Sequence, residues 1–354
     1  MKDLGKGAVE MVEVGEDGAG QRLDNYLLKR LKGVPQSLIY RIIRSGEVRV
    51  NKGRAAALTK LALGDLVRVP PVRSGPAPIR GPGGAGAPAT PKRPVPGQMR
   101  TGSDLDILFE DDALLAINKP SGLAVHGGSG VSFGVIEALR AARPNAKFLE
   151  LVHRIDRDTS GVLLLAKKRS ALVAMHALLR EGKTDKRYLA LIKGDWPHTS
   201  KHHIKTALAK YVTDEGERRV AEADNSEYAK DAHTIVSVVK RFGTGAGVDT
   251  DAMTLVEAQI KTGRTHQIRV HLASAGYPIA GDDKYGDFAF NKAEAKRGLK
   301  RMFLHAAKMA FSHPLTEGRV RIDAPLPADC QRYLEERYRG TIRHASFCPI
   351  SLNP

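Results

Sequence analysis

Apolar residues near the N-terminus of the chain repeat at helical spacing. This pattern predicts a helix over residues 23–31, which Gly33 is expected to end. It predicts a second helix over residues 36–44. Short apolar runs on either side of an Asn51-Lys52-Gly53 turn predict small strands. The first 73 residues therefore contain a compact unit of two helices and a small sheet, which we expect to span residues 18–73.

A larger part of the chain, residues 103–339, alternates short apolar runs of β type with a few amphipathic stretches. Predicted strands lie at residues 107–109, 114–117, 162–166, 188–192, 235–239 and 253–260. Predicted helices lie at residues 135–142, 170–181 and 265–275. This alternation favours an α+β domain with a mixed, largely antiparallel sheet.

The segment between the two units, residues 74–102, holds seven prolines and seven glycines, with no aromatic or acidic residue. Such a composition cannot bury apolar area, so we expect a flexible linker. Residues 340–354 carry no motif and form a tail of unknown role.

Positive charge is concentrated in the N-terminal unit. The chain has 56 Lys and Arg against 39 Asp and Glu, a net charge of +17, and residues 21–73 hold 12 basic and 3 acidic residues. A balance this basic indicates a polyanionic partner, either nucleic acid or an anionic membrane surface. The chain contains no run of about 18 apolar residues, the length that a membrane-spanning helix needs. Its N-terminus lacks the apolar core of a secretory signal. We expect a soluble cytoplasmic protein, with no membrane partner.

Neither cysteine chemistry nor a metal site is indicated. Cys330 and Cys348 cannot form a disulfide framework or a zinc pattern. His266 and His271 are five residues apart in a predicted helix, so they do not share a face as a metal-binding pair would. We therefore expect no metal.

The basic N-terminal segment, GQRLDNYLLKRLKGVPQSLIYRIIRSGEVRVNK, resembles the S4 RNA-binding module. The arginines of the second helix share its outer face. The candidate RNA contacts of this module are Arg22, Arg41, Arg44, Arg49 and Lys52. The alternative is that these side chains only solvate a surface.

The densest polar cluster of the chain, residues 153–160, lies between two apolar runs. Because buried polar groups need partners, this loop either forms an internal network or faces a ligand. Taken alone, a structural loop held by salt bridges explains the pattern equally well.

The motifs in the larger unit resemble those of the RluA family of pseudouridine synthases. They are HRID with TSG (153–156 and 159–161), KRYLALIKG (186–194), GRTHQIRVH (263–271) and NKPSG (118–122). The resemblance implies conversion of uridine to pseudouridine, in which the C1′–N1 bond breaks and C1′ joins C5. The reaction needs no cofactor. The flanking sequences resemble the C-type branch of the family, which acts on 23S rRNA, so the implied partner is 23S rRNA or a large-subunit assembly intermediate.

The family match assigns roles to particular residues. Asp156 is the implied nucleophile or base, Arg269 its partner, and Tyr188 the ring that stacks on the target base and assists proton removal at C5. Arg154 is implied to help displace the target nucleotide, since a base cannot react inside a stack. The substrate-binding set is completed by His153, Arg264 and His266.

Three other interpretations remain open at this stage. One is a D-type large-subunit synthase with other target uridines, and another is a non-catalytic S4-type RNA-binding or ribosome-assembly protein. A third is a glycoside hydrolase, which would need a second carboxylate, for which Asp158 is a weak candidate. Residues 198–241 follow the family poorly and suggest a surface insertion. We expect a monomer.

Overall fold

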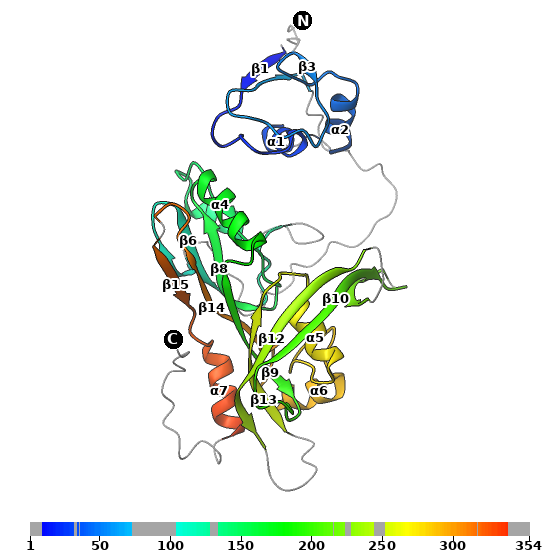
Figure 1. The fold of residues 1–354 in the computed structure, drawn as a ribbon, viewed down its shortest axis with the longest axis vertical. Coiled ribbons are helices and arrows are strands. Elements are labelled where there is room, and N and C mark those ends of the chain that lie inside the picture. The colour runs from blue at the N-terminus through cyan, green and yellow to red at the C-terminus, as the bar shows by residue number, and fades with distance from the viewer. Residues whose placement is uncertain are drawn as a thin grey trace, which may run out of the picture. The chain divides into compact units, whose positions relative to one another are not determined.

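The computed structural model describes residues 9–31, 34, 36–72, 104–127, 134–214, 216–223, 228–243, 252–316 and 318–338 (Figure 1). These residues form two compact units, one on each side of residues 73–103. Gly33, the predicted linker 74–102 and the tail 340–354 lie outside the described residues.

The N-terminal unit packs two helices against a small antiparallel sheet. The helices are α1 (Leu23–Arg30) and α2 (Gln36–Arg44). The strands, in sheet order, are β1 (Glu10–Glu13), β4 (Leu66–Val69), β2 (Arg49–Val50) and β3 (Gly53–Arg54). Leu23, Leu27 and Ile39 are fully buried in its core. The predicted helix pair and short strands are confirmed. Strand β1 was not predicted, and it lies ahead of residue 18.

The larger unit is built on an eleven-stranded sheet of the described residues. The main path runs β11 (Arg218–Glu222), β10 (His202–Val212), β12 (Lys230–Phe242), β13 (Met253–Ile260), β9 (Asp185–Lys193), β14 (Leu304–Ser312), β8 (Ser160–Ala166), β6 (Leu114–Lys119) and β5 (Asp106–Glu110). Strand β15 (Arg319–Asp323) pairs with β14, and β7 (Glu150–Leu151) pairs with β8. The only parallel pair in this described sheet is β14 with β8, which confirms a mixed, largely antiparallel sheet.

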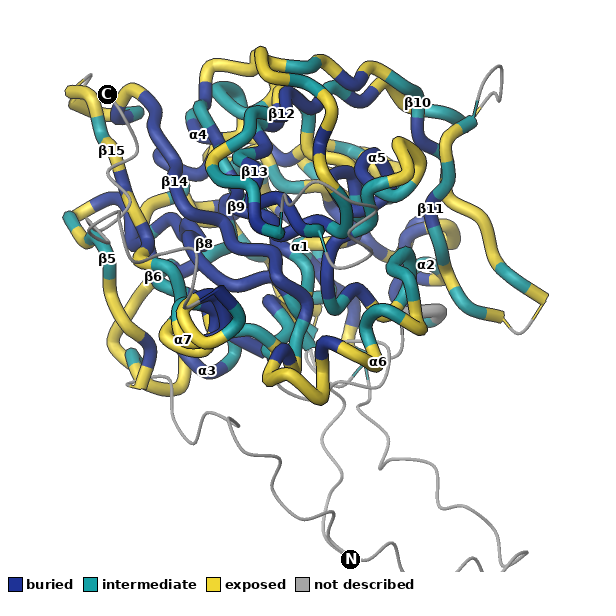
Figure 2. Tube along the Cα trace, turned by 90° about the horizontal axis from the view of Figure 1, so that it is seen from below, coloured by how far each residue is buried: buried dark blue, intermediate teal, exposed yellow. Residues whose placement is uncertain are grey.

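Helices cover both faces of this sheet because its central strands are apolar on both sides (Figure 2). In β9, Tyr188 and Ala190 belong to a core shared with α3 (Val135–Ala142) and α5 (Gln267–Ser274). The alternate residues Leu189 and Leu191 belong to a core shared with α7 (Ala328–Arg337). Helix α4 (Arg169–Arg180) packs against a third core, formed by β6, β8 and β14. This period of two sends Tyr188 to the face that α5 covers.

The interpretation of residues 198–241 as a surface insertion is wrong. Strand β12 pairs with β13 from Thr234 to Phe242, and Val236 is fully buried. Strand β10 in turn pairs with β12 through seven residues, His202 to Leu208. This segment therefore extends the sheet itself.

Candidate active site

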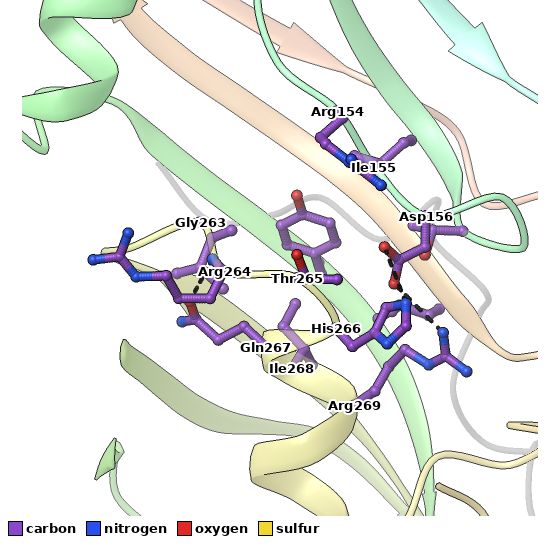
Figure 3. A pocket seen from close by; sticks show the side chains of 14 residues that line it. Arg154, Ile155, Asp156, Gly263, Arg264, Thr265, His266, Gln267, Ile268 and Arg269 are labelled. Atoms are coloured by element: carbon purple, nitrogen blue, oxygen red, sulfur yellow. Dashed lines mark hydrogen bonds and ion pairs between the residues drawn. The ribbon is translucent and has the colours of Figure 1, made fainter. Parts of the chain in front are cut away.

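A pocket opens where two loops of the larger unit meet strand β9 (Figure 3). The first loop follows β7, and the second precedes and enters α5. The pocket is lined by Arg154, Ile155, Asp156, Thr159, Tyr188, Ile260, Leu304 and residues 263–269. Three of the four sequence motifs, those at residues 153–161, 186–194 and 263–271, thus meet in one place.

The carboxylate of Asp156 faces two nitrogen groups of the second loop. Its Oδ2 lies 3.6 Å from Arg269 Nη1, and its Oδ1 lies 3.9 Å from His266 Nε2 (Figure 3). Both distances exceed those of direct hydrogen bonds. The carboxylate is thus oriented by positive and polar neighbours while its oxygens keep room for a ligand.

Arg269 is held mainly by another carboxylate. Its Nε and Nη2 donate to Asp282 Oδ2 and Oδ1 at 2.7 and 2.6 Å, and Nη2 also lies 3.3 Å from Asp283 Oδ1. Arg269 and Asp282 are both buried. The expected pairing of Arg269 with Asp156 is present as a longer ion pair. The short fork-shaped pair is with Asp282, and the contact with Asp156 uses the remaining Nη1.

The Arg269–Asp282 pair keeps both of its members charged. Burial acts against the charge of each, but the hydrogen bonds and charge of the partner outweigh it. They raise the pKa of Arg269 and lower the pKa of Asp282 relative to their ordinary values.

The loop that carries Asp156 is fixed at one end by Lys119, the last residue of strand β6. The buried ammonium of Lys119 donates to the carbonyl oxygens of Pro120, Leu123 and Arg157, each at 2.8 Å. Burial lowers the pKa of Lys119 to about 7. The other end of the loop is fixed by Gly161, whose φ is +107° and where a Cβ would lie 2.2 Å from Ala306 O. Lys119 thus shapes the loop and does not line the pocket.

The second loop is fixed by Gln267. Its side-chain oxygen accepts from Thr262 Oγ1 and Arg264 N, and its amide donates to His233 O and Thr234 Oγ1. His266, just before helix α5, has φ +53°. Few residues other than glycine adopt this conformation, although histidine is enriched among them. The turn directs His266 toward Asp156.

Tyr188 is 8% exposed and lines the pocket from β9. Burial and then the charge of Asp156 raise its pKa above the ordinary value. Its phenol is therefore protonated at neutral pH, and its ring offers an apolar surface to a ligand.

Of the other predicted substrate contacts, some line the pocket and one does not. Arg154 and Arg264 are exposed and line the pocket. His153 does not line it, because its Nε2 accepts the backbone N–H of Leu164 at 3.1 Å, and burial lowers its pKa to about 4. The predicted role of His153 in substrate binding stays a prediction, and in this structure its ring bonds to the neighbouring strand.

The predicted RNA contacts of the N-terminal unit differ in their exposure and in their hydrogen-bond partners within the protein. Arg41 and Arg44 are exposed on α2. Arg22 is paired with buried Asp24, which also accepts from Tyr40 Oη at 2.8 Å. Arg49 donates to the carbonyl oxygen of the exposed Lys52 at 3.3 Å. The arginines of α2 are thus better placed for a polyanion than Arg22.

Sequence reasoning missed two residues beside the pocket, Asp282 and Tyr285. Tyr285 Oη lies 2.8 Å from His266 Nδ1 and accepts the backbone N–H of Val220 at 3.0 Å. The available signal was an acidic pair, Asp282-Asp283, in an otherwise basic chain.

Two further properties bear on the type of site. Within the ranges given above, no group of three or more His, Cys, Asp or Glu side chains could hold a metal ion. None of the helices in those ranges is both long and apolar enough to cross a membrane.

Comparisons with known proteins agree with this geometry. The RNA pseudouridylate synthase family matches residues 113–274, and the S4 domain family matches residues 21–67. The chain belongs to the RNA pseudouridylate synthases and carries an N-terminal S4 domain. It is therefore an enzyme that converts uridine to pseudouridine, and a non-catalytic S4-type protein or a glycoside hydrolase is not favoured.

The names of the most similar relatives that we compared are more specific than the family description. The chain is 52% identical over 329 residues to ribosomal large subunit pseudouridine synthase C of Pasteurella multocida, covering 92% of this chain and 93% of that protein. It is 49% identical over 332 residues to the protein of the same name in Escherichia coli, covering 93% and 97%. Among solved structures, human RNA pseudouridylate synthase domain containing 1 is similar with a TM-score of 0.52 and 25% identity, over 64% of this chain and 86% of that one.

Proposed function

We propose that this enzyme isomerises particular uridines of 23S rRNA, as free RNA or within a large-subunit assembly intermediate. Two observations support this substrate: the relatives are named as large ribosomal subunit synthases of type C, and an S4 domain precedes the catalytic unit. The same names favour the C-type assignment over the D-type. The substrate also implies a cytoplasmic location. We further propose that the enzyme acts as a monomer, because the residues that line the pocket already bring the predicted catalytic groups together within the larger unit.

The observation that carries the proposed chemistry is the position of Asp156. Its two oxygens face separate nitrogen groups without a short bond to either, in a pocket of about 100 Å³. A cavity measured in this way needs only about 10–15 Å³ to hold one water, so the pocket has room for a planar base in place of several waters. Asp156 then acts on the flipped uridine as nucleophile or base.

The surrounding residues divide the remaining work. The neutral ring of Tyr188 stacks on the uracil, and its raised pKa argues against a role as the base that removes the C5 proton. Arg269 orients the Asp156 carboxylate, and the exposed Arg154 holds the displaced nucleotide. The atoms balance without a co-reactant, because the proton lost at C5 is matched by one gained at N1.

The test is the substitution Asp156→Asn in the full chain. We expect no pseudouridine in 23S rRNA transcript treated with this variant, while its affinity for the transcript stays within about twofold of that of the unmodified enzyme. Asp158→Asn is the matched control, because Asp158 bonds to exposed Arg157 and does not line the pocket. Modification by Asp156→Asn at the unmodified rate would overturn the assignment.

A further inference from the structure

A second cavity adjoins the proposed active site. It has a volume of about 440 Å³ and is lined by Leu208, Lys210, Val220, Tyr228, Lys230, Gly263, Arg264 and Thr265. Gly263, Arg264 and Thr265 line both cavities. Arg264 lies on the side of the pocket away from Asp156 and Arg269 (Figure 3). The two cavities therefore share one wall.

The lining of this second cavity selects a class of ligand. Lys210, Lys230 and Arg264 contribute three cations, and none of the lining residues that the structure describes is acidic. Arg264 is fixed at the shared wall because its Nε donates to Asp231 O at 2.9 Å. Tyr228, which is 78% exposed, adds an aromatic ring. Cations beside an aromatic ring suit the phosphate and base of a single-stranded nucleotide.

We propose that this cavity binds a nucleotide adjacent to the target uridine, with its phosphate on the three cations and its base on Tyr228. The proposal rests on the proposed function, since it assumes that the target base enters the neighbouring pocket. The shared wall provides a short path for the chain to pass from one cavity to the other.

The test compares Lys210→Gln/Lys230→Gln with Lys147→Gln/Lys300→Gln in the full chain. The control lysines are exposed and line neither cavity. With 23S rRNA transcript, we expect the cavity variant to raise KM about tenfold at near-constant kcat and to reduce the salt slope of binding by about two. Tyr228→Ala should weaken binding about tenfold with no change in salt slope.

A KM and a salt slope equal to those of the control pair would overturn the proposal. Failure of the proposed function is distinguishable, because then the unmodified enzyme itself would form no pseudouridine in the transcript. Binding measured in an Asp156→Ala background gives the same comparison without turnover.

A second inference comes from the hydrogen bonds around His266. Tyr285 Oη accepts the N–H of Val220 and lies 2.8 Å from His266 Nδ1, to which it can donate its own proton. A ring that accepts at Nδ1 carries its proton at Nε2 when it is neutral. That Nε2 is the atom that faces Asp156 Oδ1.

We infer that Tyr285 is a positioning residue, which selects the tautomer of His266 whose Nε2–H points at the Asp156 carboxylate. The inference rests on the proposed role of Asp156. It also gives β11, through Val220, a physical connection to the reacting group.

The charged groups around His266 oppose one another. Burial lowers its pKa, the charges of Asp156 and Asp282 raise it, and those of Arg269 and Lys284 lower it. A donor to Nδ1 favours the neutral ring. Removing the tyrosine hydroxyl should therefore make His266 easier to protonate.

The test is Tyr285→Phe in the full chain, followed by ¹⁵N NMR of histidine-labelled enzyme, with His266→Gln to assign the signals. We expect the unmodified enzyme to show a proton-free Nδ1, and the variant to show an upward shift of the His266 titration and a severalfold lower kcat at constant KM. Tyr211→Phe, at an exposed tyrosine of β10, is the control. A protonated Nδ1 in the unmodified enzyme at neutral pH would overturn the inference, whatever the activity.

Discussion

The substitution Asp282→Asn tests how much of the site depends on one buried ion pair. Asp282 Oδ1 accepts from Arg269 Nη2 and from the backbone N–H groups of Lys284 and Tyr285, and Oδ2 accepts from Arg269 Nε. An asparagine retains one acceptor oxygen and turns an NH₂ group toward the guanidinium or the backbone donors. The buried Arg269 then keeps its charge without its partner.

The expected loss of stability follows from the burial of the pair. Removing one partner of a buried ion pair costs about 3–5 kcal/mol, and the lower value applies here because Asp283 and Asp156 remain close to Arg269. At about 2–4 °C per kcal/mol for a unit of this size, the unfolding midpoint should fall by roughly 6–12 °C. A guanidinium free to shift by about 1 Å would also lower kcat on the order of tenfold to a hundredfold.

The matched control is Asp283→Asn, which removes the same charge from a carboxylate 66% exposed that contacts the same guanidinium at 3.3 Å. We expect this variant to change stability by less than about 1 kcal/mol, because exposed ion pairs contribute little. Thermal unfolding and pseudouridine formation in 23S rRNA transcript would be measured for both. Equal effects of the two substitutions would refute the reasoning, since burial would then not decide the strength of the pair.

Three further predictions concern other parts of the molecule. Gly161→Ala should lower the free energy of unfolding in urea by about 3 kcal/mol, and Gly182→Ala by about 1 kcal/mol. Both glycines have positive φ, but only Gly161 would place a Cβ against backbone atoms. Similar losses for the two variants would contradict this. Burial lowers the pKa of His305 to about 4, so its neutral ring should stabilise the fold fully above pH 6.5, and up to about 3 kcal/mol should be lost as the pH falls from 6.5 to 4. Urea unfolding across this range should show a smaller decline for His305→Asn, and an identical decline would exclude His305 as its source. Arg41→Gln/Arg44→Gln should reduce the salt slope of binding to the transcript by about two, and an unchanged slope would show that α2 does not contact phosphates.

The central strands could be predicted from sequence because both of their faces are apolar. Strand β13 matches its predicted bounds, residues 253–260, and helix α3 matches residues 135–142. Strands β10 and β11 could not be predicted this way, because only Ile204 and Leu208 in β10 and Val220 in β11 are buried. Helix α6 (Phe288–Lys296) buries only Glu294, so it has no apolar stripe to detect.

Among the site residues, those in local sequence motifs could be predicted, and those whose role depends on a contact formed on folding could not. Asp156, Arg154, Arg264 and His266 belong to local motifs, so the sequence could place them together. Asp282 acts through a contact that exists only after folding, 13 positions from Arg269 along the chain. A sequence motif also does not show which way each side chain points. His153 and Asp156 are three residues apart, yet His153 bonds to strand β8 and Asp156 faces the pocket.

The charges around Asp156 also change how the basic character of the chain should be understood. Arg269 is surrounded by three carboxylates, those of Asp156, Asp282 and Asp283, so the pocket where the chemistry is proposed gains no net positive charge from it. The adjoining cavity has three cations and no acid among the described residues of its lining. Attraction for RNA should therefore come from that cavity and from the N-terminal unit, whereas the catalytic step depends on a locally balanced cluster. Added salt should accordingly raise KM steeply and leave kcat nearly constant, because screening acts on exposed charges and little on buried ones. A kcat that fell with salt as steeply as kcat/KM would place exposed charges in the chemical step and contradict this division.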